Sequence, residues 1–171
     1  MKSLFPFHKP MAIPAFLLLC ASAVLAQGNP VNVVGAIHGY DVATVEFPNL
    51  LAAAGGRGTM SHFGSFTFTL QAKVDLPTGK GIGVFVLAFS NGDTIYGTVS
   101  GQGDAPPPPP PAPTHIMESL TIQGGTGRFR GATGKLTFQR EVILVYDDPT
   151  MPPVYDSHAG MVTGTINIPA K

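Results

Sequence analysis

Regular alternation of apolar and polar residues is the feature that most constrains how this chain can fold. In residues 62–76, HFGSFTFTLQAKVDL, every second residue from Phe66 onward is apolar and the residues between are polar. A period of two places these two sets on opposite faces of a β-strand. One face of this strand is therefore expected to be buried and the other to meet water.

Seven further stretches rich in Val, Ile, Thr and Phe complete a set of eight expected strands. They are separated by Gly, Pro or Asp and lie at residues 31–38, 40–47, 81–90, 93–101, 114–123, 134–146 and 157–168. The pair Asn91-Gly92 predicts a two-residue hairpin turn between the strands that flank it. Residues 48–58, PNLLAAAGGRG, indicate a helical turn.

Eight short, mostly meandering strands predict an all-β fold, an eight-stranded antiparallel closed barrel. Closure is favoured over an open sheet because it leaves no unpaired edge strand. A two-sheet β-sandwich is the structural alternative. An outer-membrane barrel is a further alternative, which the absence of Trp and of aromatic girdles in the sequence disfavours.

The first 26 residues have the composition of a secretory signal peptide. Lys2 and Lys9 precede the uncharged apolar residues 11–25, and the small residues Val24 and Ala26 fit a cleavage site. We therefore expect cleavage after Ala26, a periplasmic or secreted location, and one domain over residues 27–171. No membrane span is expected, because the apolar run is shorter than the roughly 20 residues that a spanning helix needs.

Removal of this leader changes the cysteine count and the net charge of the remaining chain. The only cysteine, Cys20, is lost, so core packing must stabilise the domain without disulfides. Lys2 and Lys9 are 2 of the 10 Lys and Arg residues, which leaves 8 against 10 Asp and Glu, a net charge of −2. The sequence shows no basic patch of the kind that binds nucleic acid.

A proline-rich insert, DAPPPPPPAPT, occupies residues 104–114 between two expected strands. Consecutive prolines favour an extended polyproline II segment without internal hydrogen bonds. The insert is interpreted as a stiff hairpin loop. The alternative is a docking segment for a partner with an aromatic groove.

A glycine-rich stretch at residues 124–134, GGTGRFRGATG, has the look of a phosphate-binding loop. Phe129 and Leu136 stand where a Walker-type loop needs Gly and Ser or Thr. Such a loop also opens a helix, whereas residues 135–142, KLTFQREV, continue with strand alternation. The glycines are therefore predicted to be turn residues.

The same stretch resembles the GGTGRF signature of the dirigent and allene oxide cyclase barrels. The segments SHFGSFTFT, NGDTIYGTVSG and GMVTGTINI are similar to their secreted bacterial relatives, and the resemblance covers most of residues 60–168. It implies a calycin-type barrel with a cavity for small apolar molecules, trimeric in many plant members, which cyclise an epoxide or steer radical coupling. No catalytic residue of that family matches a position here, so the resemblance transfers no activity.

Hairpin pairing singles out one charged pair. If residues 114–123 and 134–146 form a hairpin centred near Phe129, Glu118 lies opposite Arg140 on a face that is otherwise apolar. The neighbouring pairs are then Ile122 with Leu136, Leu120 with Phe138, and Ile116 with Val142. One interpretation of Glu118 and Arg140 is a structural ion pair, buried or at the rim of the barrel. The other is a functional pair in an apolar pocket, which either anchors a polar group or uses the carboxylate as acid or base.

The expected pocket wall also contains apolar residues and two histidines: His62, Phe66, Phe68, Leu120, Phe138 and His158. The histidines are interpreted as wall residues, with metal binding or base catalysis beside Glu118 as the alternative. No HxH or HExxH spacing is present, so no metal and no cofactor are expected. Arg128 and Arg130 flank Phe129 and are interpreted as solvated turn charges, with anion binding as the alternative.

Three functions fit these observations. The first is an exported barrel that binds a small apolar molecule, or serves as a stable scaffold, without catalysis. The second is a cyclase or coupling-guide enzyme that uses Glu118 and Arg140. The third is an extracellular interaction module whose contact is the proline-rich loop.

Overall fold

The computed structural model describes residues 28–109, 111–145 and 154–170. The expected signal peptide and its cleavage site after Ala26 lie outside these residues. The side chains of residues 144–145, 154–155 and 157–158 are also outside the description, although their backbone belongs to strands.

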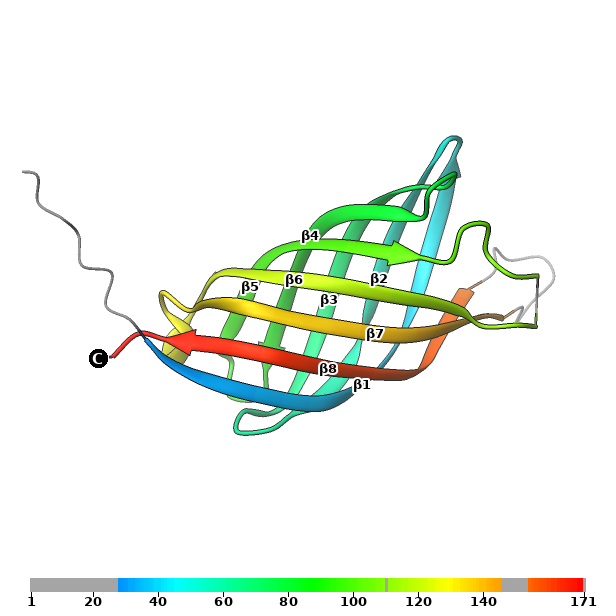
Figure 1. Cartoon of the computed structure of the whole chain (residues 1–171). Coiled ribbons are helices and arrows are strands. Elements are labelled where there is room, and N and C mark those ends of the chain that lie inside the picture. Colours follow the sequence, from blue (N-terminus) through cyan, green and yellow to red (C-terminus); the bar gives the residue numbers. More distant parts are fainter. Residues whose placement is uncertain (1–27, 110, 146–153, 171) are drawn as a thin grey trace, which may run out of the picture.

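The chain forms a closed antiparallel barrel of eight strands (Figure 1). Each strand pairs with the next along the chain, and the last pairs with the first. The barrel confirms the predicted fold class and excludes the two-sheet sandwich. The strands are β1 (Asn29–Glu46), β2 (Asn49–Met60), β3 (Gly64–Asp75), β4 (Lys80–Phe89), β5 (Thr94–Gly103), β6 (Thr114–Gly125), β7 (Thr133–Val145) and β8 (Val154–Ile168).

Two expectations about the first strands are wrong. The stretches 31–38 and 40–47 form one continuous strand, β1, and the expected helical turn at 48–58 is strand β2. Gly39 does not break β1, because its backbone pairs with Gly56 of β2 and with Ser157 of β8. Its position is buried, and an added Cβ there would overlap the backbone oxygen of Gly55. The Ala- and Gly-rich β2 has low intrinsic strand preference, but it pairs with β1 on one side and β3 on the other.

The hairpin at Asn91-Gly92 is wider than predicted. Four residues, Ser90 to Asp93, separate β4 from β5 where a two-residue turn was expected. Gly92 has a φ of +85°, and the backbone amide of Phe89 donates to the oxygen of Asp93 at 2.8 Å. The glycine therefore serves the turn as expected, within a longer loop.

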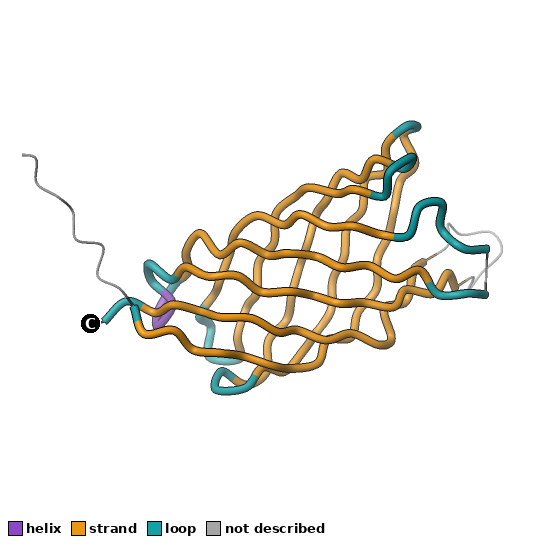
Figure 2. Tube along the Cα trace, in the orientation of Figure 1, coloured by secondary structure: helices purple, strands orange, loops and turns teal. Residues whose placement is uncertain are grey.

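One end of the barrel is closed by the glycine-rich turn. The short 3-10 helix η1 (Gly127–Phe129) joins β6 to β7 at this end (Figure 2). Gly127 and Gly131 lie in the turn with positive φ, as predicted. Gly124 and Gly125 belong instead to β6, and Gly134, which also has a positive φ, belongs to β7. Phe129 is fully buried and packs on the rings of Phe63 and Phe89, with centroids 5.2 and 4.7 Å away.

Arg128 belongs to this closure and is not simply a solvated turn charge. Its guanidinium carbon lies 5.3 Å from the ring centres of Phe63 and Phe89 and 4.8 Å from that of Phe129. Its Nη2 donates to the backbone oxygen of Phe63 at 3.2 Å, and its Nε lies 3.6 Å from the carboxylate of Asp93. Stacking of the cation on the rings holds the turn over the end of the barrel.

The half of the barrel next to η1 is packed solid. Inward-facing residues of all eight strands meet there, alternating with outward-facing polar residues as the period of two requires. The fully or nearly fully buried side chains include Phe66, Phe68, Phe85, Leu87, Phe89, Ile95, Leu120, Leu136, Phe138, Val162 and Ile166.

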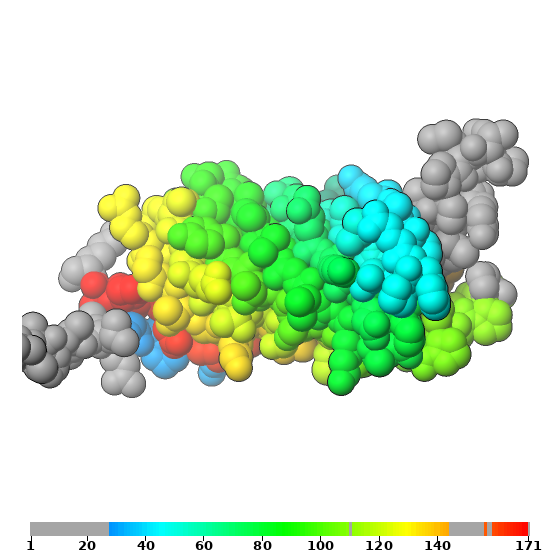
Figure 3. All heavy atoms as spheres, turned by 90° about the horizontal axis from the view of Figure 1, so that it is seen from above, coloured from blue at the N-terminus to red at the C-terminus, as the bar shows by residue number. Residues whose placement is uncertain are grey.

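The outer face of β4 carries an apolar stripe. Ile82, Val84 and Val86 of β4 point outward and are 71%, 53% and 39% exposed. In the space-filling view the green strands β4 and β5 lie between the yellow η1 turn and the cyan β1–β2 end of the barrel (Figure 3).

Within the described residues, no helix has the length and apolar character needed to cross a membrane.

Candidate functional site

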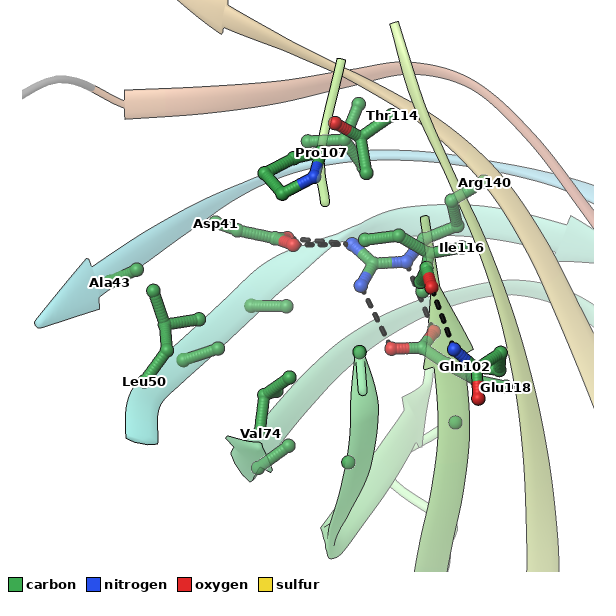
Figure 4. Close-up of a pocket in the computed structure, with 18 of the residues that line it drawn as sticks. Asp41, Ala43, Leu50, Val74, Gln102, Pro107, Thr114, Ile116, Glu118 and Arg140 are labelled. Atoms are coloured by element: carbon green, nitrogen blue, oxygen red, sulfur yellow. Dashed lines mark hydrogen bonds and ion pairs between the residues drawn. The ribbon is translucent and has the colours of Figure 1, made fainter. Parts of the chain in front are cut away.

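A cavity opens at the end of the barrel opposite η1. Its volume is about 160 Å³, and its walls are largely apolar. Among the described residues, those of β1 to β7 contribute to it, and the first residues of the proline-rich loop border its mouth. Figure 4 shows its side chains converging from several strands. The main apolar side chains of the wall are Leu50, Leu70, Val74, Val99, Ile116 and Val142.

The cavity exists because inward-facing residues become small toward this end of the barrel. On β3 the inward series runs from Phe66 and Phe68 in the packed half to Ala72 in the cavity wall. The small residues also lie side by side on neighbouring strands, since Ala52 pairs with both Ala43 and Ala72. Gly81 likewise pairs with Gly101. Small neighbouring residues on the inner wall leave space that no other side chain fills.

Three buried charged residues form one wall of the cavity. The guanidinium of Arg140, on β7, lies between the carboxylates of Asp41 on β1 and Glu118 on β6 (Figure 4). Arg140 Nη1 donates to the two carboxylate oxygens of Asp41 at 2.6 and 2.9 Å. Nε and Nη2 donate to the two oxygens of Glu118 at 3.0 and 2.8 Å. The three residues are only 6%, 5% and 4% exposed, in the order Asp41, Glu118, Arg140.

Glu118 and Arg140 are brought together as predicted, but not in the predicted register. Glu118 lies opposite Phe138, and Arg140 lies opposite Ile116. The other predicted pairs are also wrong: Leu120 faces Leu136, Ile122 faces Gly134, and Val142 faces Thr114. The hairpin is centred on Arg128, one residue before Phe129, so the register shifts by two. An even shift keeps both side chains on the inner face, and the long arginine reaches its diagonal neighbour.

Asp41 is the member of the buried charged cluster that sequence reasoning missed. The inward positions of β1 are Val33, Ile37, Gly39 and Asp41, all separated by even steps. Continuous alternation across Gly39 therefore carried the signal for an inward carboxylate. Division of the strand at that glycine concealed it.

Burial and charge shift the ionisation of the cluster. Burial raises the pKa of the Glu118 carboxyl above its ordinary value, Arg140 opposes this rise, and the negative charge of Asp41 adds to it. For Arg140, burial acts to lower the pKa, but Glu118 and Asp41 outweigh it and raise that pKa further above its usual range. The guanidinium therefore stays protonated, and a proton that enters the cluster in acid goes to a carboxylate.

The rim of the cavity adds a third carboxylate. Asp104, in the loop after β5, lines the mouth together with Gln102 and Pro107. Its Oδ2 accepts a hydrogen bond from the backbone amide of His115 at 2.9 Å, and a second hydrogen bond joins it to the Nδ1 of that ring at 3.1 Å. These hydrogen bonds lower the pKa of the Asp104 carboxyl. Asp104 and Pro107 place the start of the proline-rich loop at the cavity entrance.

The other expected pocket residues lie elsewhere. Phe66, Phe68, Leu120 and Phe138 are buried in the packed half, and none of them lines the cavity. His62 is exposed and occupies the turn between β2 and β3 with a φ of +67°, so it is not on the inner wall. The side chain of His158 lies outside the described residues. Among the described residues, no group of three or more His, Cys, Asp and Glu is placed to hold a metal ion.

Comparisons of the chain with protein-family models, with curated proteins and with solved structures found no match. The resemblance to the dirigent and allene oxide cyclase barrels therefore stays a prediction from the sequence segments that carry it.

Proposed function

We propose that this chain is an exported barrel that binds a small, largely apolar molecule in the cavity at its open end. The observation that supports this proposal is the cavity itself, about 160 Å³ in volume with apolar walls and a buried charged cluster. Apolar cavities of roughly 150 Å³ accept a molecule of the size of benzene, and a longer ligand extends through the mouth. The leader-like residues 1–26 support export.

The open cavity favours a small-molecule role over an interaction module. A barrel filled along its whole length leaves no room for a ligand, whereas here only the half next to η1 is filled. Both oxygens of Glu118 accept hydrogen bonds from Arg140, which fixes the carboxyl in position. A polar group held in this way orients a ligand whose body lies against the apolar wall.

A matched pair of substitutions tests this proposal. Ala72→Phe places a large ring in the cavity, and Ala53→Phe adds the same ring at an exposed position on β2. Benzyl alcohol, titrated into the ¹⁵N-labelled protein, should shift the amides of cavity residues in the wild type and in Ala53→Phe. Ala72→Phe should lose these shifts while its circular dichroism spectrum stays unchanged. Equal binding by both variants, or shifts confined to the outer surface, would contradict the proposal.

The raised pKa of Glu118 favours a second candidate, a cyclase or coupling-guide enzyme of the dirigent and allene oxide cyclase kind. In such an enzyme Glu118 acts as the proton donor or acceptor in an apolar pocket. Glu118→Gln should abolish turnover in an enzyme, whereas in a binding protein it should only change affinity. Retained binding of the probe by this variant shows that lost turnover reflects lost chemistry.

We also propose that the barrel self-associates through the apolar stripe of Ile82, Val84 and Val86. Three large apolar side chains exposed in a row on one strand favour contact with another protein surface. A homotrimer is the assembly that the sequence resemblance implies.

A further inference from the structure

The cavity carries an excess of negative charge. Among the described residues, the charged ones that line it are three carboxylates, Asp41, Asp104 and Glu118, and one guanidinium, Arg140. Three negative charges and one positive charge leave a net charge of −2 when all four groups are ionised. Lys73 and Lys80, on the strands that form the wall, are exposed on the outside of the barrel. The apolar wall concentrates this field, because electrostatic attraction is stronger where water is excluded.

The charged cluster also has more unused hydrogen-bond acceptors than unused donors. Each of the four oxygens of Asp41 and Glu118 accepts one hydrogen bond from Arg140. Each oxygen keeps a second lone pair, so the spare acceptor sites of the two carboxylates outnumber the N–H groups that the guanidinium has left. The carboxylate side chains are only 9% and 7% exposed, in the order Asp41, Glu118. The cavity is therefore the place from which a donor reaches them.

We propose that the cavity selects a small protonated amine on an apolar body over neutral and anionic molecules of the same shape. The inference rests on the proposed function and names its ligand class. An ammonium group has three N–H donors and a positive charge, which match the spare acceptors and the excess charge. The apolar body of the ligand packs on Leu50, Val74 and Val142. A carboxylate ligand would meet like charges and find fewer free donors than acceptors.

Three probes of one shape test this inference. Benzylamine is a cation, benzyl alcohol is neutral and benzoate is an anion at pH 7.5. We would titrate each into the ¹⁵N-labelled protein, expressed from the full chain, at low salt and follow the amides of cavity residues. Benzylamine should bind at least tenfold more tightly than benzyl alcohol, and benzoate should bind most weakly.

The outcomes separate the inference from the proposed function. Binding of benzyl alcohol as tight as that of benzylamine would overturn the charge selection and leave the small-molecule cavity standing. Tightest binding of benzoate would overturn it in the same way. Failure of all three probes to reach the cavity would contradict both the inference and the proposed function.

Charge-removing variants give a second measurement. Asp41→Asn removes one charge from the cavity with almost no change of shape, and Glu141→Gln removes one from the exposed outer face of β7. The preference for benzylamine over benzyl alcohol should fall at least threefold in Asp41→Asn and stay unchanged in Glu141→Gln. If Asp41→Asn does not fold, Asp104→Asn at the exposed rim should lower the same preference about twofold. An unchanged preference in the cavity variants that fold would overturn the inference.

Discussion

Replacement of Arg140 by Ala perturbs the buried cluster most directly. The change removes four hydrogen bonds, two to Asp41 and two to Glu118. Both carboxylates then remain in a wall where they are 6% and 5% exposed, without a cation beside them. Such a pair relieves its repulsion by taking up a proton.

The loss of stability can be estimated from the free energy needed to keep that proton bound at pH 7. A carboxyl group with an ordinary pKa near 4.5 requires roughly 3.4 kcal/mol to be held neutral at pH 7, at about 1.36 kcal/mol per pKa unit. One proton shared by the two carboxyls removes most of the repulsion, so Arg140→Ala should lose about 3 to 5 kcal/mol of unfolding free energy. This is also the range expected when a buried ion pair loses one partner.

The pH dependence of the loss has a definite sign. Without Arg140, burial and the negative charge of Asp41 raise the pKa of the Glu118 carboxyl above its value in the unfolded chain. The contribution of this group to stability is therefore fully present below the unfolded value, and it is lost as the pH rises through the folded value. The difference between wild type and variant should accordingly be largest at pH 7 and shrink to below about 2 kcal/mol at pH 4.5.

Urea unfolding followed by circular dichroism measures this difference, since the chain has no Trp. Arg57→Ala, on the exposed outer face of β2, is the matched control and should change stability by about 0.5 kcal/mol or less. An Arg140→Ala variant as stable as Arg57→Ala at pH 7, or a loss that does not depend on pH, would refute the reasoning.

Three further predictions concern single residues. The Glu118 carboxyl, followed by ¹³C NMR, should titrate with a midpoint above 4.5, and a midpoint at or below that value would show that Arg140 outweighs burial. Gly127→Ala should lose about 1 to 3 kcal/mol in urea unfolding, because φ is +53° and an added Cβ would overlap the Asp93 carboxylate. Gly64→Ala, with a φ of +79° and open space around the added Cβ, is its control and should lose less; equal losses would exclude a role for the overlap. Val84→Lys should dissociate the assembly in light scattering, whereas Thr44→Lys on exposed β1 should not, and a wild-type monomer at all concentrations would refute self-association.

The fold was predictable because the alternation of apolar and polar residues assigns each residue to a face of its strand, whichever residues pair across the sheet. Alternation in residues 62–76 assigned Phe66, Phe68 and Leu70 to one buried face, as β3 has them. The same parity kept Glu118 and Arg140 on the inner face although the predicted register was two residues off. Strand limits were less predictable, because Gly39 and the Ala-rich β2 lack strand preference of their own and are held by pairing on both sides.

The cavity was not predictable from local pattern. It depends on small residues of different strands lying at the same level, as Ala43, Ala52 and Ala72 do. That alignment follows from a register that alternation leaves open by multiples of two. The aromatic residues expected in the pocket wall fill the opposite half of the barrel for the same reason. The alternation of apolar and polar residues assigns them to the inner face, but it does not give their position along the barrel axis.

Native mass spectrometry of the wild-type protein and of Ala72→Phe, both incubated with an extract of the host's growth medium, tests most directly whether the open end of the barrel holds a small molecule. The wild type should carry an additional mass that is released on denaturation, and Ala72→Phe should show the polypeptide mass alone. Identical spectra of wild type and variant would contradict a ligand in this cavity.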